Sequence, residues 1–297
     1  MLTQVETLMR DSVAELDSYS LCLFDKLPAG KRLRAKLILK IASENENALK
    51  LASVVELIHA ASLLHDDVID DAETRRGIAS INAVFGNKTA IMLGDILYSK
   101  GFSLLTSFPE EVSKTIADAV TMLSIGELMD VELSKSLNLN QELYFDMIYK
   151  KTAVLIEAAA KSAALLSDKD AEAFALYGKN LGLAFQIIDD VLDITMDSET
   201  LGKPALHDFE EGKTTLPYIY LFETLESDEK EKLKGLYKKS LNEEESLWIK
   251  SIMIESGAIE KSVKLAQKLG HEALTAIENE KNESLEMVIK NMIEREF

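Results

Sequence analysis

The feature that most constrains the fold is a helical repeat of apolar residues that runs through nearly the whole chain. Stretches such as ALKLASVVELIHAASLLHDDVID and AEAFALYGKNLGLAFQIIDDVLDIT place apolar side chains three and four residues apart, which is typical of α-helices. Only four prolines interrupt the 297 residues, and strand-like alternation is scarce. The sequence therefore predicts an all-α protein, with residues 1–297 folded as a single-domain helical bundle.

The composition favours a water-soluble protein of the cytoplasm. Apolar residues make up 47% of the chain, which is enough for a large core. No apolar run reaches the roughly 18 residues needed to cross a bilayer, and the first twenty residues lack the basic and apolar regions of a signal peptide. The single Cys22 excludes an internal disulfide and a thiolate metal cage.

A net charge of −18 argues against nucleic acid and against stable attachment to an anionic membrane. It does not exclude a small anionic ligand. Such a ligand requires clustered Lys and Arg side chains, or divalent metals that bridge it to carboxylates.

Carboxylates are crowded at two places. The pattern Asp-Asp-x-x-Asp occurs at Asp66, Asp67 and Asp70, and again at Asp189, Asp190 and Asp193. Residues i and i+4 share one face of a helix, and like charges at that spacing repel each other. Mg²⁺ typically takes one or two carboxylates together with substrate phosphates. The repeated pattern therefore predicts Mg²⁺ sites that hold a polyphosphate, with a solvated acidic helix face as the alternative.

Two other metal sites are less consistent with the sequence. Neither aspartate trio leads into the glycine-containing loop of an EF-hand. A di-iron bundle needs two Glu-x-x-His pairs, and only Glu56 and His59 form one.

Basic residues cluster as an anionic substrate would require. The clusters are GKRLRAK at 30–36, Arg75 with Arg76, KKT at 150–152, and Lys203 with Lys213. The last two belong to LGKPALHDFEEGKTTLP, which the glycines and prolines predict to be a long loop over 201–217. Each cation alone could be a solvated charge, but these clusters taken together in so acidic a chain favour a diphosphate ligand.

Taken in order, these motifs resemble the trans-polyprenyl diphosphate synthase family. The similarity runs from GKRLR through ELIHAASLLHDDVIDDAETRRG, the Gly-Asp at 94 and 95, KTA at 151–153 and FQIIDDVLD to GKPALHDFEEGKTTLP. The resemblance implies an all-α fold around a central cavity and a homodimer. It also implies condensation of isopentenyl diphosphate onto an allylic diphosphate, with Mg²⁺ as cofactor.

The resemblance also assigns roles to residues. The two aspartate trios resemble the metal-binding motifs on the allylic diphosphate. The other residues fall into three groups: Arg75, Lys151 and Lys203 for the allylic diphosphate; Lys31, Arg34, His59 and Arg76 for isopentenyl diphosphate; and Thr152 and Gln186 at the reaction centre. Lys213 is expected to bind substrate as well. Ala35 departs from the family, which usually has proline after this arginine, and the expected consequence is a less rigid isopentenyl diphosphate site.

In the family that this chain resembles, the length of the product depends on residues one helical turn before the first aspartate trio. Ala61 and Ser62 lie about 5.4 Å along the helix from Asp66. Short-chain members of the family typically carry an aromatic residue there. Two small side chains predict a long all-trans product, of the octaprenyl type, stopped further along by Met122 or Leu123. Close helix packing is the alternative reason for the small residues.

Other functions stay open at this point. A short-chain farnesyl or geranylgeranyl diphosphate synthase shares every motif except the small residues. A terpene cyclase would typically lack the second Asp-Asp-x-x-Asp, and a non-catalytic helical scaffold would not respond to Mg²⁺. By family analogy, the expected destination of the product is a quinone side chain.

Overall fold

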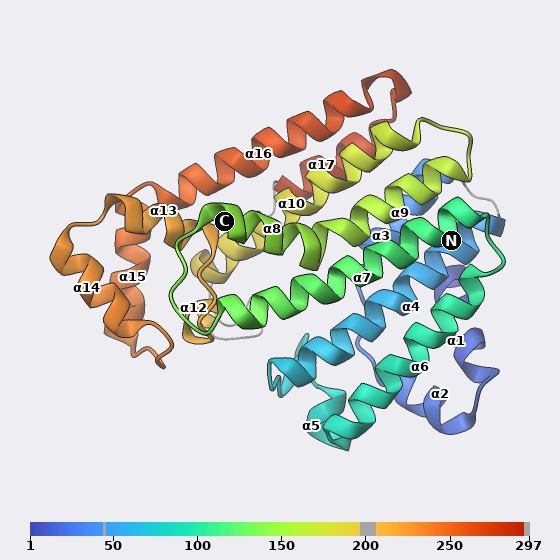
Figure 1. The fold of residues 1–297 in the computed structure, drawn as a ribbon, viewed down its shortest axis with the longest axis horizontal. Helices are drawn as coiled ribbons and strands as arrows, with labels where there is room; N and C mark the ends of the chain where they lie inside the picture. The colour runs from blue at the N-terminus through green and yellow to red at the C-terminus, as the bar shows by residue number, and fades with distance from the viewer. Residues whose placement is uncertain (44–45, 197–205, 294–297) are drawn as a thin grey trace. The chain divides into compact units, whose positions relative to one another are not determined.

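The structure is a computed structural model that describes residues 1–43, 46–196 and 206–293. Helices dominate these residues, and the sheet found among them is a hairpin of two-residue strands. The all-α prediction is confirmed (Figure 1). By backbone contacts the chain groups into two compact units, residues 1–120 with 158–175, and residues 121–157 with 176–297. The prediction of a single domain stays a prediction.

The first unit contains the N-terminal helices and the hairpin. Its elements are α1 (Leu2–Ala14), α2 (Ser18–Phe24), α3 (Leu33–Ala42), α4 (Glu46–Ile69), β1 (Thr74–Arg75), β2 (Ile78–Ala79), α5 (Ile81–Phe85) and α6 (Asn87–Leu105). Three long helices contribute segments to both units: α7 (Glu110–Leu133), α9 (Val154–Leu165) and α10 (Ala171–Thr195).

Helix α4 forms the core of the first unit. It packs against α1, α3 and α6, and Figure 1 shows it running along α6. A helix covered on several faces is apolar all round rather than amphipathic. Among the described residues, α4 is the one helix long and apolar enough to cross a membrane, but 67% of its apolar window is buried inside the protein. Its hydrophobicity is therefore accounted for by internal packing.

The second unit contains the C-terminal helices. Its own elements are α8 (Gln141–Ile148), the π-helix η1 (Tyr149–Ala153), α12 (His207–Glu210), α13 (Leu216–Thr224), α14 (Ser227–Leu236), α15 (Glu243–Glu255), α16 (Ala258–Ala276), the 3₁₀-helix η2 (Glu278–Glu280) and α17 (Glu283–Ile293). Helix α16 packs against α13, α15 and α17. It buries small residues, and a Cβ on Gly270 would meet Ile289 of α17 at 2.9 Å.

The prediction of one long loop over 201–217 is wrong at residues 207–210 and 216–217, which are helical, whereas residues 211–215 lie between helices as predicted. Residues 207–210 form α12, and residues 201–205 lie outside the described residues. Phe209 of this helix is buried and stacks on Tyr218, with 4.5 Å between ring centroids. The packing of this buried phenylalanine therefore holds a segment whose glycines and prolines had predicted a loop.

The hairpin that follows α4 also escaped the sequence analysis. Thr74 pairs with Ala79 and Arg75 with Ile78. The turn residues Arg76 and Gly77 have φ of 54° and 76°, as a two-residue hairpin turn requires. An arginine at the first turn position hides the usual Asn-Gly or Asp-Gly signal.

Candidate functional site

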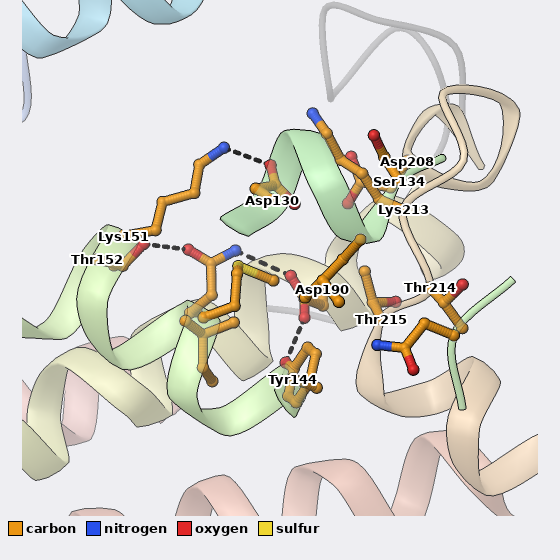
Figure 2. A pocket seen from close by; sticks show the side chains of 15 residues that line it. Asp130, Ser134, Tyr144, Lys151, Thr152, Asp190, Asp208, Lys213, Thr214 and Thr215 are labelled. Carbon is orange, nitrogen blue, oxygen red and sulfur yellow. Dashed lines mark hydrogen bonds and ion pairs between the residues drawn. The ribbon is translucent and has the colours of Figure 1, made fainter. Parts of the chain in front are cut away.

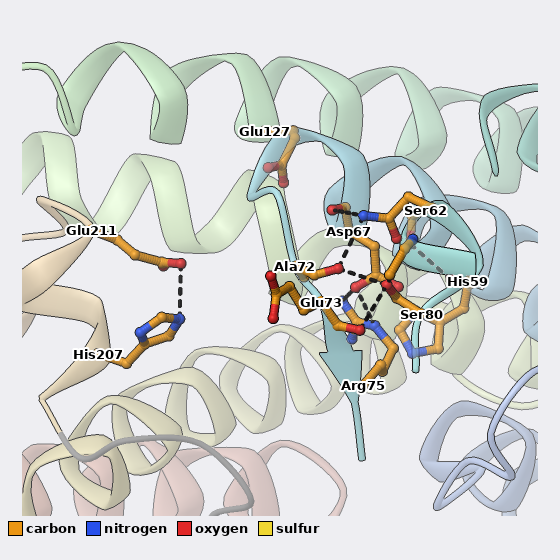
Figure 3. Close-up of polar contacts among 12 residues, drawn as sticks. His59, Ser62, Asp67, Ala72, Glu73, Arg75, Ser80, Glu127, His207 and Glu211 are labelled. Atoms are coloured by element: carbon orange, nitrogen blue, oxygen red, sulfur yellow. Dashed lines mark hydrogen bonds and ion pairs between the residues drawn. The ribbon is translucent and has the colours of Figure 1, made fainter. Parts of the chain in front are cut away.

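The first aspartate trio lies at the C-terminal end of α4, in the first unit. Asp67 is only 4% exposed, and Arg75 approaches its Oδ1 at 2.6 Å with both Nε and Nη2 (Figure 3). Burial raises the pKa of Asp67, although the ion pair with Arg75 opposes this effect. Asp66 and Asp70 are half-buried beside it. A guanidinium therefore compensates part of the crowded charge.

The hairpin directs Arg75 back to the trio. Asn82 donates from Nδ2 to the carbonyl oxygens of Asp67 and Ala72, both at 3.0 Å. Ser80 donates from Oγ to the Ala72 carbonyl at 2.6 Å. These bonds tie the chain after α4 to the start of α5 (Figure 3). Sequence reasoning missed Ser80 and Asn82, because neither belongs to a recognisable motif.

A cationic cluster lies at the start of α3, also in the first unit. Arg34 and His59 are half-buried, and Lys31 is exposed. Burial, followed by the charges of Arg34, Arg75 and Arg76, holds the pKa of His59 well below its usual value, so the imidazole is neutral. Within the part of the chain that the structure describes, the buried Nε of Arg34 and Nδ1 of His59 have no hydrogen-bond partner. Buried polar atoms of this kind normally have a partner, and an anionic ligand would supply one.

The second aspartate trio lies on α10, in the second unit. Asp190 is 3% exposed, and both of its oxygens accept hydrogen bonds. Tyr144 donates to Oδ2 at 2.5 Å, and Gln186 donates from Nε2 to Oδ1 at 2.9 Å. Thr152 in turn donates to Oε1 of Gln186 at 2.7 Å (Figure 2). Burial and the nearby Asp208 raise the pKa of Asp190 well above its usual value.

The other two members of this trio differ in their surroundings. Asp193 is buried, and its Oδ2 accepts a hydrogen bond from the backbone N–H of Asp208 at 3.2 Å. Asp193 is therefore oriented towards α12. Asp189 is half-buried. Because the two trios lie in different units, the prediction that they hold metals jointly stays a prediction.

The π-helix η1 presents Lys151 and Thr152. Lys151 Nζ lies 2.5 Å from Asp130 Oδ2 and 3.1 Å from Glu127 Oε2 on α7. A Cβ on Gly126 would meet the Lys151 backbone nitrogen at 2.3 Å, so only glycine permits this close approach of α7 to η1. Sequence reasoning missed Glu127, Asp130 and Tyr144. The signal for the two acids was a pair of carboxylates spaced i, i+3 in the otherwise uncharged stretch 119–131.

Asp130 and Tyr144 are among the residues of the second unit that line a pocket of about 160 Å³. The sequence-predicted residues around it are Lys151, Thr152, Gln186, Asp190 and Lys213. Lys213 Nζ lies 2.8 Å from Glu211 Oε2, and His207 Nε2 lies 2.9 Å from Glu211 Oε1. Burial alone would raise the pKa of Glu211, but the hydrogen bonds and electrostatic interactions with His207 and Lys213 lower it to about 2. The pocket thus combines buried carboxylate with ammonium groups, as a metal-bound diphosphate would require.

The remaining predicted residues are less informative. Lys203 lies outside the described residues. Arg76 is exposed and donates from Nη1 to the Ala29 carbonyl at 2.7 Å. Ala61 and Ser62 are buried in the first unit, and in the second unit Leu123 is buried while Met122 is 40% exposed. Whether any of these four side chains meets a growing product stays a prediction.

The donor chemistry suits a hard cation, but no cage is preformed. Among the described residues, no group of three or more His, Cys, Asp or Glu side chains is arranged to hold a metal ion. Mg²⁺ retains several waters and binds through one or two carboxylates plus phosphate oxygens. Asp67 and Asp190 therefore fit a metal that arrives together with its anionic substrate.

Known proteins resemble this chain in sequence and in fold. The sequence model of the polyprenyl synthetase family matches residues 20–253. The solved octaprenyl pyrophosphate synthase from Helicobacter pylori has a TM-score of 0.95 and 42% identity, covering 99% of this chain and 98% of that chain. A polyprenyl synthase from Caulobacter crescentus, solved with calcium and isoprenyl diphosphate, has a TM-score of 0.91 and 32% identity, covering 100% and 95%.

Similarity extends to a relative named for a shorter product. The geranylgeranyl diphosphate synthase of Sulfolobus acidocaldarius is 36% identical over 265 residues, which are 84% of this chain and 80% of that protein. Overall similarity therefore does not distinguish long products from short ones.

Proposed function

Because this chain belongs to the polyprenyl synthetase family, we propose that it condenses isopentenyl diphosphate head-to-tail onto an allylic diphosphate such as farnesyl diphosphate. Small residues one turn from Asp66 favour a long all-trans product of about thirty to forty-five carbons. The observation that carries the proposal is the pocket in which a doubly hydrogen-bonded Asp190 lies with Lys151 and Lys213.

In this proposal, Asp67 and Asp190, with the other aspartates of their trios, hold Mg²⁺. The metal would supply Lewis acidity, drawing negative charge onto the leaving diphosphate. Arg75, Lys151 and Lys213 would compensate the charge of the diphosphate from fixed positions. The same cations stabilise the diphosphate after the allylic C–O bond has broken.

The cationic cluster of the first unit would hold the second substrate. Arg34 would bind the diphosphate of isopentenyl diphosphate as a planar donor. His59 is neutral, so one ring nitrogen can donate a hydrogen bond without adding charge. The isopentenyl double bond then attacks the allylic carbocation, and the new chain loses a proton to the released diphosphate. No nucleophilic Ser, Cys or His takes part.

We further infer a cytoplasmic homodimer. Helix α7 leaves Ile125, Leu128 and Val131 exposed in the second unit, and apolar side chains that gather on one helix face often mark a protein interface. Light scattering coupled to size exclusion measures the mass directly, and a monomer at micromolar concentration would contradict this inference.

A short-chain synthase remains the second candidate, favoured by the similarity to a relative named for geranylgeranyl diphosphate. Terpene cyclase and scaffold functions have less support, because both aspartate trios are complete. A quinone side chain is the proposed destination of the product.

A thermal shift assay tests the proposed site. Mg²⁺ and inorganic diphosphate together, at about a hundred times their dissociation constants, should stabilise the protein by about 2.7 kcal/mol, a rise in Tm of about 5 °C. Either ligand alone should give much less. Asp190→Asn keeps the shape of the side chain and should abolish the joint effect. An equal shift in both proteins, or none in the wild type, would contradict the proposal.

A further inference from the structure

We propose that Glu56 is a positioning residue for the isopentenyl diphosphate site, acting through the backbone N–H of Ala35 and the guanidinium of Arg32. This inference rests on the proposed function. It concerns the segment 29–35, which carries Lys31 and Arg34 into the cationic cluster.

The start of α3 has an unusual cap. The first N–H groups of a helix have no partner within the helix, and the residue before α3, Arg32, provides no side-chain cap. Instead, the N–H of Ala35 donates to Oε1 of Glu56, on α4, at 3.0 Å. The helix dipole favours a carboxylate at this end. Glu56 therefore fixes where α3 begins.

The second oxygen of Glu56 holds the residue before the helix. Arg32 Nη1 donates to Oε2 at 3.3 Å, and Arg32 Nε lies 3.5 Å from Glu6 Oε1 on α1. Glu56 is 2% exposed, and a charge so buried requires such partners. One carboxylate thus anchors the chain on both sides of Arg34.

The other end of the segment is anchored as well. Arg76 Nη1 donates to the Ala29 carbonyl at 2.7 Å, and a Cβ on Gly30 would meet the same Nη1 at 3.1 Å. With both ends held, Arg34 has little freedom to reorient. His59, one helical turn after Glu56 on α4, belongs to the same arrangement, so the ligand-facing atoms are preorganised.

Ala35 is the feature particular to this chain. Proline, which the resemblance leads one to expect at this position, has no N–H to donate. It would leave Oε1 of Glu56 buried without this hydrogen bond. The expected loss of rigidity is thus offset by a hydrogen bond that only a non-proline residue can make, and Ala35 and Glu56 act as a pair.

Steady-state kinetics of three variants tests the pair. Ala35→Pro and Glu56→Gln should each raise KM for isopentenyl diphosphate about tenfold, as expected for a hydrogen bond to a charged group. KM for the allylic substrate should stay unchanged. Ala35→Gly retains the N–H and is the matched control, so its KM for isopentenyl diphosphate should stay near the wild-type value. A merely structural defect would not affect one substrate selectively.

The double variant shows whether the two residues act through one interaction. Independent effects would multiply to about a hundredfold, whereas coupled residues are not additive. We expect the KM of Ala35→Pro/Glu56→Gln to stay close to that of one single variant. If the KM of the double variant rises by the product of the two single-variant increases, the two residues do not act through one interaction.

Direct binding separates this inference from the proposed function. Isothermal calorimetry with isopentenyl diphosphate gives a Kd that needs no turnover. The Tm of Glu56→Gln shows whether this variant is folded. If the wild type condenses the substrates and the folded Glu56→Gln variant binds isopentenyl diphosphate as tightly as the wild type, the positioning role is wrong and the proposed function stands. If the wild type binds without condensing and Glu56→Gln binds about tenfold more weakly, the function is wrong and the positioning role stands. Absence of binding in the wild type would overturn both.

Discussion

The buried carboxylate of Asp190 is held in one orientation by hydrogen bonds from individual side chains. Tyr144 and Gln186 each donate to one oxygen, and Thr152 fixes Gln186. These bonds set the direction of the remaining lone pairs. Groups that orient a metal ligand typically change metal affinity although they do not touch the metal.

Replacing Tyr144 with phenylalanine tests this arrangement. Tyr144→Phe should raise the Mg²⁺ concentration needed for half-maximal activity by about tenfold or more. Tyr177→Phe is the matched control, because Tyr177 is equally buried and donates to the Leu285 carbonyl at 2.9 Å, away from the pocket. A magnesium titration of both variants measures the effect. Identical titrations for Tyr144→Phe and the wild type would show that the phenol does not support a metal ligand.

Glu211 links stability to pH. Its pKa is lowered to about 2 in the folded protein, against about 4.3 for an unperturbed glutamate. A carboxyl group whose pKa is lower in the folded protein stabilises the fold at pH values above its pKa in the unfolded protein. This stabilisation is lost as the pH falls through the pKa of the group in the folded protein. Glu211→Gln should therefore destabilise the protein by about 3 kcal/mol at pH 7 and by about half as much at pH 3.

Urea unfolding of Glu211→Gln and the wild type at both pH values provides the measurement. A destabilisation that is the same at pH 7 and pH 3 would mean that the charge of Glu211 does not stabilise the fold.

Some site residues were predictable from sequence, and others were not. The aspartate trios are local patterns, and the spacing of Asp66, Asp67 and Asp70 is visible within five consecutive residues. Tyr144 acts on Asp190 across 46 residues of sequence, and Glu56 acts on Ala35 across 21. Such roles depend on tertiary packing, which periodicity does not reveal.

At the scale of elements, η1 and α7 together explain how two adjacent residues reach one pocket. The π-helix carries Lys151 and Thr152, and both line the pocket. Gly126 allows α7 to bring Asp130 and Glu127 against Lys151. The sequence predicted a helix here but not its π geometry, because the extra residue per turn leaves no mark on apolar periodicity. π-helical turns are frequent at functional sites.

Helix α4 carries the prediction about product length. If the growing chain passes one turn below Asp66, an aromatic residue at position 61 should block it. Ala61→Phe should then shorten the product to about fifteen or twenty carbons while condensation continues. Chromatography of the extracted products measures this directly.

The control for this variant is Ala60→Phe, which places the same ring about 100° around the helix. Overpacking typically costs about 1–3 kcal/mol, so the Tm of both variants must be compared. Ala61 is fully buried, and a destabilised Ala61→Phe that still makes the wild-type product would support close helix packing as the reason for the small residue.

At the scale of the whole molecule, the fold followed from periodicity. Helical repeats and scarce prolines were sufficient to predict an all-α chain, because helix formation depends on local spacing. The hairpin and α12 were missed, since a turn arginine and a single buried phenylalanine give weak local signals. The net charge of −18 disfavours binding to polyanionic surfaces, whereas a small anionic substrate needs only a local group of cations.

The central claim is that this chain elongates an allylic diphosphate with isopentenyl diphosphate in a metal-dependent reaction. The most direct measurement is incubation of the purified protein with farnesyl diphosphate, labelled isopentenyl diphosphate and Mg²⁺, followed by chromatography of the dephosphorylated products. The account predicts all-trans products of about thirty to forty-five carbons, and none with EDTA or with Asp67→Ala or Asp190→Ala. Absence of labelled product from the wild type, or undiminished product from either aspartate variant, would contradict it.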